Sequence, residues 1–520
     1  MKRNIFLVFL ILLGLSCKEK SQQPANNSEV SISEPLSYSE KFRPQFHFSP
    51  PAKWMNDPNG LVYHQGYYHL FYQYYPDDIV WGPMHWGHAM SKDLIRWENK
   101  PIALYPDEHG LIFSGSAVID KQNSSGFGTK ENPPLVAIFT YHLMEGEKAG
   151  RKDFQTQGIA YSLDNGITWT KYEGNPVIGN TDIKDFRDPK VDWHDESERW
   201  IMTLVAGDHA KFYASDNLKD WELISEFGKD IGAHGGVWEC PDFFKLPVAG
   251  TSEEKWVLLI SINPGAPNGG SGTQYFVGEF DGTQFTTKQT QNKWLDHGRD
   301  NYAGVTYNNT PNEDRIFIGW MSNWDYARDT PTQVWRSAMT VPRKLTLHRD
   351  GDSYYLKNYP LTNFSTITSE LEQHEKISLA TPLQIQKENF NQSEIRFDAN
   401  LSAALKVNLR NEGGENITFE MNPVSKQLSF DRTGSGQTQF AEKFAPSLQK
   451  QPYHPKDEIV EIRLLIDASS VEVFVDKGRY VFTNQIFPEN PYTTLEITGA
   501  STSTLNALTI NQLTSIWNNE

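Results

Sequence analysis

The chain has 520 residues, which predicts two to four domains at about 150 residues each, and fewer if some of them are all-β. Its formal net charge of -17 argues against nucleic acid as the main partner, because phosphate binding needs a basic face. Aromatic residues make up 13% of the chain, a density that favours β-strands and supplies flat faces for sugar rings. A neutral, sugar-like ligand is therefore favoured.

The N-terminus has the pattern of an export signal. Lys2 and Arg3 precede an apolar run from Ile5 to Leu15, which is shorter than the roughly 20 residues that a membrane-spanning helix needs. Cys17 follows this run directly, as in the signals of bacterial lipoproteins. We therefore predict a lipoprotein-type signal over residues 1–17 with Cys17 as the lipidated residue. A plain cleaved signal, giving a periplasmic or secreted protein, is the alternative.

Residues 18–41 are rich in Ser, Glu, Asn, Gln and Pro, a composition typical of a flexible tether. We expect a protein held at the outer membrane or cell surface of a bacterium only by its lipid. Cys17 and Cys240 are the two cysteines of the chain, in contexts too different for a mutual disulfide, so the fold is not a disulfide scaffold.

From residue 42 to 353, short β-rich runs alternate with turn residues, and the near absence of a 3.6-residue apolar period predicts few helices. A strand end, an Asp or Asn turn and then an aromatic residue recur every 50 to 70 residues or so. The four occurrences are Ser91–Trp97, Ser162–Trp169, Ser215–Trp221 and Gly278–Phe285. Such repeats of about four strands predict a β-propeller, with unrelated hairpins as the alternative.

The pattern changes after residue 353. Residues 354–370 are predicted as a linker with a short helical piece, and residues 371–520 show period-2 alternation over seven or more short strands. This predicts a β-sandwich, with a hairpin that turns at Asp476-Lys477-Gly478. No titratable cluster stands out there, so we assign this domain a structural role.

Three acidic motifs of the first region are candidates for catalysis. Asp57 lies in Asn56-Asp57-Pro58-Asn59-Gly60, which alone favours a turn, but the adjoining Trp54 suggests a displayed nucleophile. Asp188 follows Arg187, and a local salt bridge that keeps the carboxylate ionised is the simplest interpretation.

Glu239 is the third candidate, between Trp238 and Cys240. Desolvation there would raise the pKa of the carboxyl, as a general acid requires, although a half-buried, hydrogen-bonded Glu is the alternative. Each motif falls in a different repeat, and the blades of a propeller converge on a central funnel. Glycoside hydrolysis is the reaction that places one ionised and one protonated carboxyl around a sugar.

Several ordered blocks together resemble glycoside hydrolase family 32, the invertase, inulinase and levanase family. The blocks are W-M-N-D-P-N-G at Trp54–Gly60, F-S-G-S at Phe113–Ser116, R-D-P at Arg187–Pro189, W-E-C-P at Trp238–Pro241, D-N-Y-A at Asp300–Ala303 and G-W-M-S-N-W-D-Y-A at Gly319–Ala327. The resemblance extends over residues 42–517 or so. It implies an all-β fold, a five-bladed β-propeller followed by a C-terminal β-sandwich.

The resemblance also implies roles for the three carboxyl groups. Asp57 would be the nucleophile, Glu239 the acid and then the base, and Asp188 the transition-state stabiliser, assisted by Arg187. A double displacement with retention is implied, with the two catalytic carboxyls about 5 to 5.5 Å apart. No metal and no cofactor is implied, because the protonated Glu assists departure of the leaving group.

Further residues in or near these blocks are candidates for binding the fructosyl unit. They are Asn56, Gln73, Trp81, Trp86, Ser114, Arg187, Tyr302 and Trp320. For all of them except Asn56 and Arg187, a place in the propeller core is the alternative, most of all for Trp86 and Trp320. Cys240 resembles a residue that tunes the acid, because no histidine adjoins it to activate a thiolate.

Within the family, the segments around residues 296–308 and 315–347 most resemble bacterial exo-acting fructan β-fructosidases. We therefore expect a monomer that releases terminal fructose from levan or inulin and cleaves some sucrose. A fructosyltransferase that uses the same intermediate is the nearer alternative, and a non-catalytic fructan-binding protein the remoter one. The Asn-Asp-Pro-Asn-Gly and Glu-Cys-Pro blocks disfavour a related arabinose-acting glycosidase.

Overall fold

The computed structural model describes residues 38–400 and 403–517. The predicted signal, Cys17 and the tether up to residue 37 lie outside the described residues. Helix in the described part is limited to α1 (Met144–Lys148) and two 3-10 helices, η1 (Pro311–Glu313) and η2 (Thr362–Ile367), so the prediction of few helices is confirmed. None of these helices has the length and apolar character needed to cross a membrane.

Five sheets, antiparallel except for one short strand of the first, follow one another along the first part of the chain. The first contains β1 (Lys53–His64), β2 (Tyr67–Tyr75), β3 (His85–Ser91) and β4 (Glu98–Leu104), and the second β5 (Leu111–Ile119), β6 (Leu135–His142), β7 (Gln155–Ser162) and β8 (Thr170–Lys171). The third contains β9 (Phe186–His194), β10 (Arg199–Ala206), β11 (Ala210–Ser215) and β12 (Glu222–Phe227). The fourth contains β13 (Val237–Pro247), β14 (Glu254–Asn263), β15 (Gly272–Phe280), β16 (Phe285–Thr286) and β17 (Lys293–Trp294). The fifth contains β18 (Tyr302–Thr306), β19 (Ile316–Met321), β21 (Ala338–Met339), β22 (Arg343–Asp350) and β23 (Ser353–Pro360).

The sequence repeat is the turn between the third and fourth strands of successive sheets. The Ser91 and Ser162 hydroxyls donate hydrogen bonds to Asp93 and Asp164, at 3.0 and 2.8 Å. These aspartates accept backbone N–H groups in turn, as Asp281 does in the fourth sheet. The shared turn chemistry therefore reflects a shared blade structure and not unrelated hairpins.

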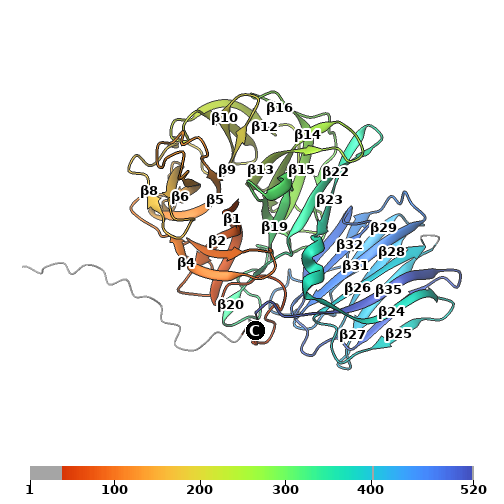
Figure 1. The fold of residues 1–520 in the computed structure, drawn as a ribbon. Helices are drawn as coiled ribbons and strands as arrows, with labels where there is room; N and C mark the ends of the chain where they lie inside the picture. Colours follow the sequence, from red (N-terminus) through yellow and green to blue (C-terminus); the bar gives the residue numbers. More distant parts are fainter. Residues whose placement is uncertain (1–37, 401–402, 518–520) are drawn as a thin grey trace, which may run out of the picture. The chain divides into compact units, whose positions relative to one another are not determined.

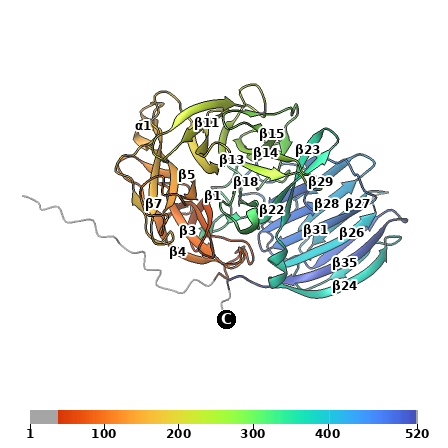
Figure 2. The same ribbon diagram turned by 45° about the horizontal axis from the view of Figure 1, so that its top comes forward.

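The first strand of each sheet lies at the centre of the five-sheet ring. β1, β5, β9, β13 and β18 each contact the next, and β18 contacts β1. Figures 1 and 2 show these strands converging inside the ring. The ring is also tied by β20 (Trp335–Arg336), which pairs in parallel with the start of β1. This arrangement is the predicted β-propeller.

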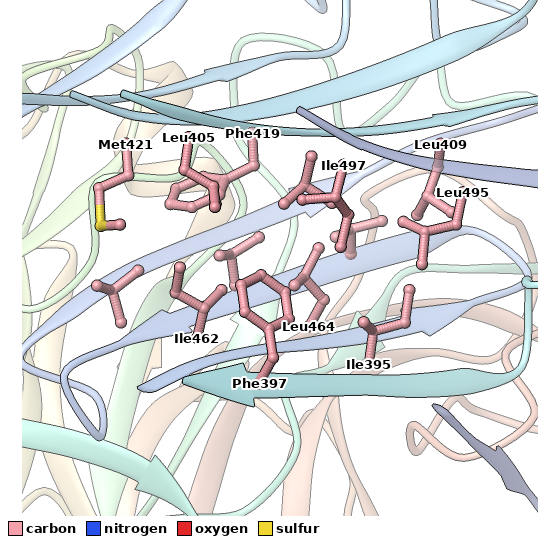
Figure 3. Packing of buried hydrophobic residues seen from close by; sticks show 14 of the residues in the cluster. Ile395, Phe397, Leu405, Leu409, Phe419, Met421, Ile462, Leu464, Leu495 and Ile497 are labelled. Carbon is pink, nitrogen blue, oxygen red and sulfur yellow. The ribbon is translucent and has the colours of Figure 1, made fainter. Parts of the chain in front are cut away.

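Two six-stranded sheets form the second region, in the orders β24-β35-β26-β31-β32-β33 and β25-β34-β27-β28-β29-β30. Their bounds are β24 (Thr368–Ser378), β25 (Leu383–Gln386), β26 (Ser393–Asn400), β27 (Leu405–Arg410), β28 (Asn416–Asn422), β29 (Gln427–Asp431), β30 (Gln449–Pro452), β31 (Ile459–Asp467), β32 (Ser470–Val475), β33 (Tyr480–Gln485), β34 (Thr494–Gly499) and β35 (Thr504–Leu513). Side chains of both sheets, such as Phe397 and Phe419, meet in one buried layer (Figure 3). The predicted β-sandwich and its Asp476-Lys477-Gly478 hairpin turn are both present.

The structure moves one predicted boundary. β23 (Ser353–Pro360) pairs with β22 in the fifth propeller sheet, so residues 354–360 are a propeller strand and not the start of a linker. Alternation in this strand is hard to recognise because Asn358, 1% exposed, takes an inward position together with Leu356. The connection shortens to η2, which matches the expected short helical piece, and β24 already begins at Thr368.

Buried charges join distant parts of the chain near the sandwich. Arg343 of β22 hydrogen-bonds Glu472 of β32 and Asp296, and His47 contacts Asp467 at 2.8 Å. Burial alone lowers the pKa of His47, but the Asp467 and Glu472 carboxylates outweigh it and raise that pKa to about 9. Sequence inspection missed this cluster because its members come from separate segments of the chain, from His47 to Glu472.

Candidate active site

The three candidate carboxyl groups project from the central strands of three different sheets. Asp57 lies on β1, Asp188 on β9 and Glu239 on β13. Ser114 on β5 and Tyr302 on β18 complete a set with one residue from each central strand. The expectation that separate repeats would bring these side chains together is met.

Each central strand carries a β-bulge at the candidate residue. The register of β1 shifts between Met55 and Pro58, and that of β13 between Glu239 and Asp242. The strand pairings of β5, β9 and β18 break at the equivalent place. A bulge redirects a side chain and tolerates a proline, since no ladder N–H is needed there. The Asp-Pro-Asn-Gly segment is thus a bulged strand and not the turn that its residues suggest alone.

Asp57 accepts hydrogen bonds from Asn56 and Ser114, in addition to the Cys240 thiol described below. The Asn56 amide donates to Oδ1 at 3.0 Å, and the Ser114 hydroxyl donates to Oδ2 at 2.7 Å. Asn56 is fixed in turn by the indole N–H of Trp54, which donates to its Oδ1 at 2.7 Å. These contacts orient the carboxylate in the way that a nucleophile requires.

Arg187 pairs with other carboxyls more closely than with its neighbour Asp188. Its Nη2 donates to Glu239 Oε1 at 3.0 Å and its Nη1 to Asp185 Oδ1 at 2.8 Å. The Nε atom lies 3.8 Å from Asp188 Oδ2. The pair with Asp188 is therefore the longest of the three ion pairs, and the guanidinium group reaches Glu239 as well.

Asp188 is buried close to two other carboxyl groups. Burial raises its pKa to about 7, and the nearby Glu239 and Asp57 carboxyls add to the rise, against the opposing effects of Arg187 and the Cys240 backbone N–H. Arg187 lowers this pKa, in the expected direction, but burial outweighs its effect. The three carboxyls share a site, so ionisation of one disfavours ionisation of the others.

Glu239 has the character expected of a proton donor. Burial raises its pKa above the ordinary value, while Arg187 and the Tyr302 hydroxyl, which donates to Oε2, act in the opposite direction. The predicted direction is confirmed. A raised pKa favours the protonated carboxyl that a general acid requires.

Cys240 separates two of the carboxyls. Its Sγ lies 3.5 Å from Asp57 Oδ2 and 3.6 Å from Asp188 Oδ2, and its backbone N–H donates to Asp188 at 2.9 Å. Burial raises the pKa of the thiol well above its ordinary value, so the group stays protonated and donates to the carboxylates. This geometry fits a tuning residue and not a thiol nucleophile.

A cavity of about 240 Å³ opens over these groups. Of the residues predicted to bind substrate, Asn56, Gln73, Trp81, Ser114 and Arg187 line it. Tyr302 reaches it only through Glu239, and the fully buried Trp86 and Trp320 pack in the core, which was the alternative for both. The lining residues that sequence inspection missed are Phe113, His142, Glu147, Phe154, Gln155, Asp185, Asn263, Trp324 and Arg328.

Most of these missed residues lie on loops or at strand ends, where no spacing rule links them to the motifs. Phe113 and Trp324 are the exceptions, because they lie inside the Phe113–Ser116 and Gly319–Ala327 blocks, and that position was the signal for them. Within residues 38–400 and 403–517, no group of three or more His, Cys, Asp or Glu side chains is arranged to hold a metal ion.

Comparison with protein families assigns both regions. Residues 47–360 match the model of the glycosyl hydrolases family 32 N-terminal domain, and residues 360–514 match that of the family's C-terminal domain. The chain belongs to glycosyl hydrolase family 32. It is therefore a glycoside hydrolase, and the resemblance inferred from the sequence blocks is confirmed.

Relatives of this family 32 enzyme cover nearly all of it. It is 45% identical over 529 residues to a levanase of Bacillus subtilis (strain 168), covering 99% of this chain and 76% of the relative. It is 42% identical over 528 residues to the extracellular exo-inulinase of Aspergillus niger, covering 94% of this chain and 98% of the relative.

Solved structures agree with the fold of this family 32 enzyme. The exo-inulinase of Aspergillus awamori superposes with a TM-score of 0.85 at 39% identity, covering 92% of this chain and 100% of that one. A fructofuranosidase from Schwanniomyces occidentalis, complexed with fructosylnystose, gives 0.84 at 30% identity, covering 93% and 100%. The predicted fold class, a propeller followed by a sandwich, is confirmed.

We predict that Tyr302→Phe moves the alkaline limb of the pH profile upward. The Tyr302 hydrogen bond lowers the pKa of Glu239, so its removal lets that pKa rise and the acid form persists to higher pH. The measurement is kcat/KM against pH, which reports ionisations of the free enzyme. Tyr307→Phe is the matched control, because among the described residues its buried hydroxyl has no hydrogen-bond partner. An alkaline limb that stayed in place or moved down in Tyr302→Phe would contradict this account.

Proposed function

We propose that this family 32 enzyme is a retaining, exo-acting β-fructosidase that releases terminal fructose from fructans and also cleaves sucrose. The observation that carries the proposal is the placement of Asp57 and Glu239 on central strands of different sheets, both lining one small cavity with Asp188. The relatives named levanase and exo-inulinase support fructan as the substrate class.

In the first step, the Asp57 carboxylate attacks the anomeric C2 of the terminal fructosyl unit. Glu239 gives its proton to the glycosidic oxygen, the C2–O bond breaks, and a fructosyl ester forms on Asp57. Ser114 and Asn56 hold the attacking carboxylate through the hydrogen bonds to its two oxygens. Arg187 and Asp188 lie where they can bind ring hydroxyls, so we assign them to stabilisation of the transition state.

In the second step, the ionised Glu239 takes a proton from water, which attacks C2 and releases fructose from Asp57. Two displacements at one carbon return the original configuration, hence retention. Arg187 contacts Glu239 directly at 3.0 Å and stabilises its ionised form, which supports the change from acid to base between the steps.

The size of the cavity supports exo action. The space over the carboxyls has a volume of about 240 Å³, and a separate space lined by Pro58, Pro189 and Pro241 has a volume of only about 10 Å³. A cavity of this size suits a terminal sugar unit better than an internal unit, which needs room for the chain on both of its sides.

We also propose that the enzyme is exported and acts outside the cytoplasm, where a polymer is accessible. The signal-like residues 1–17 and the relative described as extracellular support export. The lipid on Cys17 and the monomeric state remain predictions from the sequence.

The test is product analysis with purified protein on levan, inulin and sucrose in parallel. We expect free fructose as the first and main product, and methyl β-fructofuranoside when methanol competes with water, because retention preserves the β configuration. Intact substrates, or early release of long oligomers, would overturn the proposal. Oligosaccharides longer than the substrate at high sucrose would instead favour a fructosyltransferase. The rate ratio of levan to inulin would set the linkage preference.

A further inference from the structure

A second depression adjoins the catalytic cavity at the rim of the propeller. It is an open groove of about 470 Å³, nearly twice the volume of the cavity. It is lined by Gly207 and Asp208 of the β10–β11 turn, Gly235 and Gly236 before β13, Asn263 at the end of β14 and Pro264 after it. Asn263 lines both spaces, so the groove adjoins the cavity at this residue.

The groove lies on the side of the proposed acid. Val237, at its edge, pairs with Asn263 across β13 and β14 and stands two residues before Glu239. The backbone N–H of Trp238 donates to the Gly207 carbonyl at 2.8 Å, which ties the β10–β11 turn to the strand of the acid. A general acid must lie against the leaving group that it protonates, so the leaving group extends toward this side.

The lining is suited to a neutral, hydroxyl-rich chain. A Cβ atom added at Gly207 or Gly235 would meet nothing within 4 Å, so these glycines leave the groove open and their backbone groups accessible. The Asp208 carboxylate, 56% exposed, accepts a hydrogen bond from His234 Nδ1 at 3.0 Å. The His234 ring is stacked on Trp238, with ring centroids 5.7 Å apart, which positions the pair beside the groove. A fixed carboxylate and exposed amides bind sugar hydroxyls without requiring charge on the ligand.

We propose that this groove binds the part of a fructan that lies beyond the first sugar of the leaving group. The proposal rests on the β-fructosidase function proposed above. In this proposal the fructan chain leaves the cavity past Asn263 and lies along the β10–β11 turn. Asp208 and Gly207 of that turn then recognise the length of the fructan. Sucrose has a single sugar as its leaving group, so it ends before the groove begins.

Two variants test the groove by different routes. Asp208→Ala removes the carboxylate, and Gly207→Asn places a side chain into the open space; asparagine tolerates the left-handed φ of +69° at this position. The measured quantity is the ratio of kcat/KM on inulin to kcat/KM on sucrose, for wild type and variants. We expect each variant to lower this ratio about three- to tenfold, the loss of one hydrogen bond or its equivalent, with kcat/KM on sucrose unchanged.

Asp216→Ala is the matched control, an exposed aspartate at the opposite end of β11, and it should leave the ratio unchanged. If the ratio is unchanged in both groove variants while the wild type is active on inulin, the groove does not bind the fructan, and the proposed β-fructosidase function is unaffected. An equal loss on sucrose and inulin, or a lowered ratio in the control, also overturns the role of the groove. A wild-type enzyme inactive on inulin would instead refute the proposed function, so the two failures are distinguishable.

Discussion

Asp57→Asn is expected to lower kcat on sucrose and on inulin by about 10⁴-fold or more, because an amide cannot form the fructosyl ester. Asparagine keeps the size of the side chain and an acceptor for the Ser114 hydroxyl, which donates to Asp57 Oδ2 at 2.7 Å in the native protein. Initial rates on both substrates check the expectation, and Asp57→Ala should behave in the same way.

The same variant should be at least as stable as the native enzyme above neutral pH. Asp57 raises the pKa values of Asp188 and Glu239. A carboxyl whose pKa is raised on folding stabilises the folded protein at low pH, and this contribution is lost as the pH rises through the pKa in the folded state, about 7 for Asp188. Removing one negative charge therefore relieves a cost that is present above about pH 7. Thermal unfolding at pH 6 and pH 8 measures the difference.

Asp185→Asn provides the matched control, because this carboxylate lines the same cavity and hydrogen-bonds the Arg187 guanidinium at 2.8 Å. Its loss should slow the reaction far less, since it takes no part in bond formation. Near-normal turnover by Asp57→Asn, or an equal loss in both variants, would contradict the role of nucleophile.

The propeller was predictable because four of its five sheets repeat one local turn. The Ser and Asp side chains of that turn satisfy backbone groups two to three residues away, so the pattern is visible in a short window such as Ser91–Trp97. The sandwich was predictable from period-2 alternation for the same local reason. The last propeller strand, β23, was not recognised as a strand because its buried residue Asn358 is polar and interrupts the alternation of apolar and polar residues.

The carboxyl groups were predictable as a set, but their electrostatics were not. Sequence proximity suggested that Arg187 serves Asp188, whereas the bulges turn its guanidinium toward Glu239, 52 positions away. The pKa of Asp188 depends on three carboxyls meeting in space, which no spacing along the chain encodes. For the same reason, the position of Asn263 beside the cavity and of Asp208 in the groove could be recognised only from the three-dimensional structure.

Glu239→Ala should lower kcat on sucrose and inulin by about 10² to 10⁴-fold, the usual contribution of a positioned general acid. A substrate whose leaving group needs no proton, such as 4-nitrophenyl β-fructofuranoside, should form the fructosyl ester on Asp57 at close to the normal rate. The second step then stalls, because no base activates water, so a burst of nitrophenol precedes a slow steady state. Stopped-flow absorbance measures both phases.

The pH dependence gives the same variant a second readout. In the native enzyme, the alkaline limb of kcat/KM follows loss of the Glu239 proton, whose pKa burial raises. Without that carboxyl, the limb should disappear on the aryl substrate, and Glu147→Ala, a change to another cavity-lining carboxyl, should retain it. If Glu239→Ala slowed the aryl and sugar substrates equally, Glu239 would be acting on the position of Arg187 and Tyr302, its hydrogen-bond partners, and not as the proton donor.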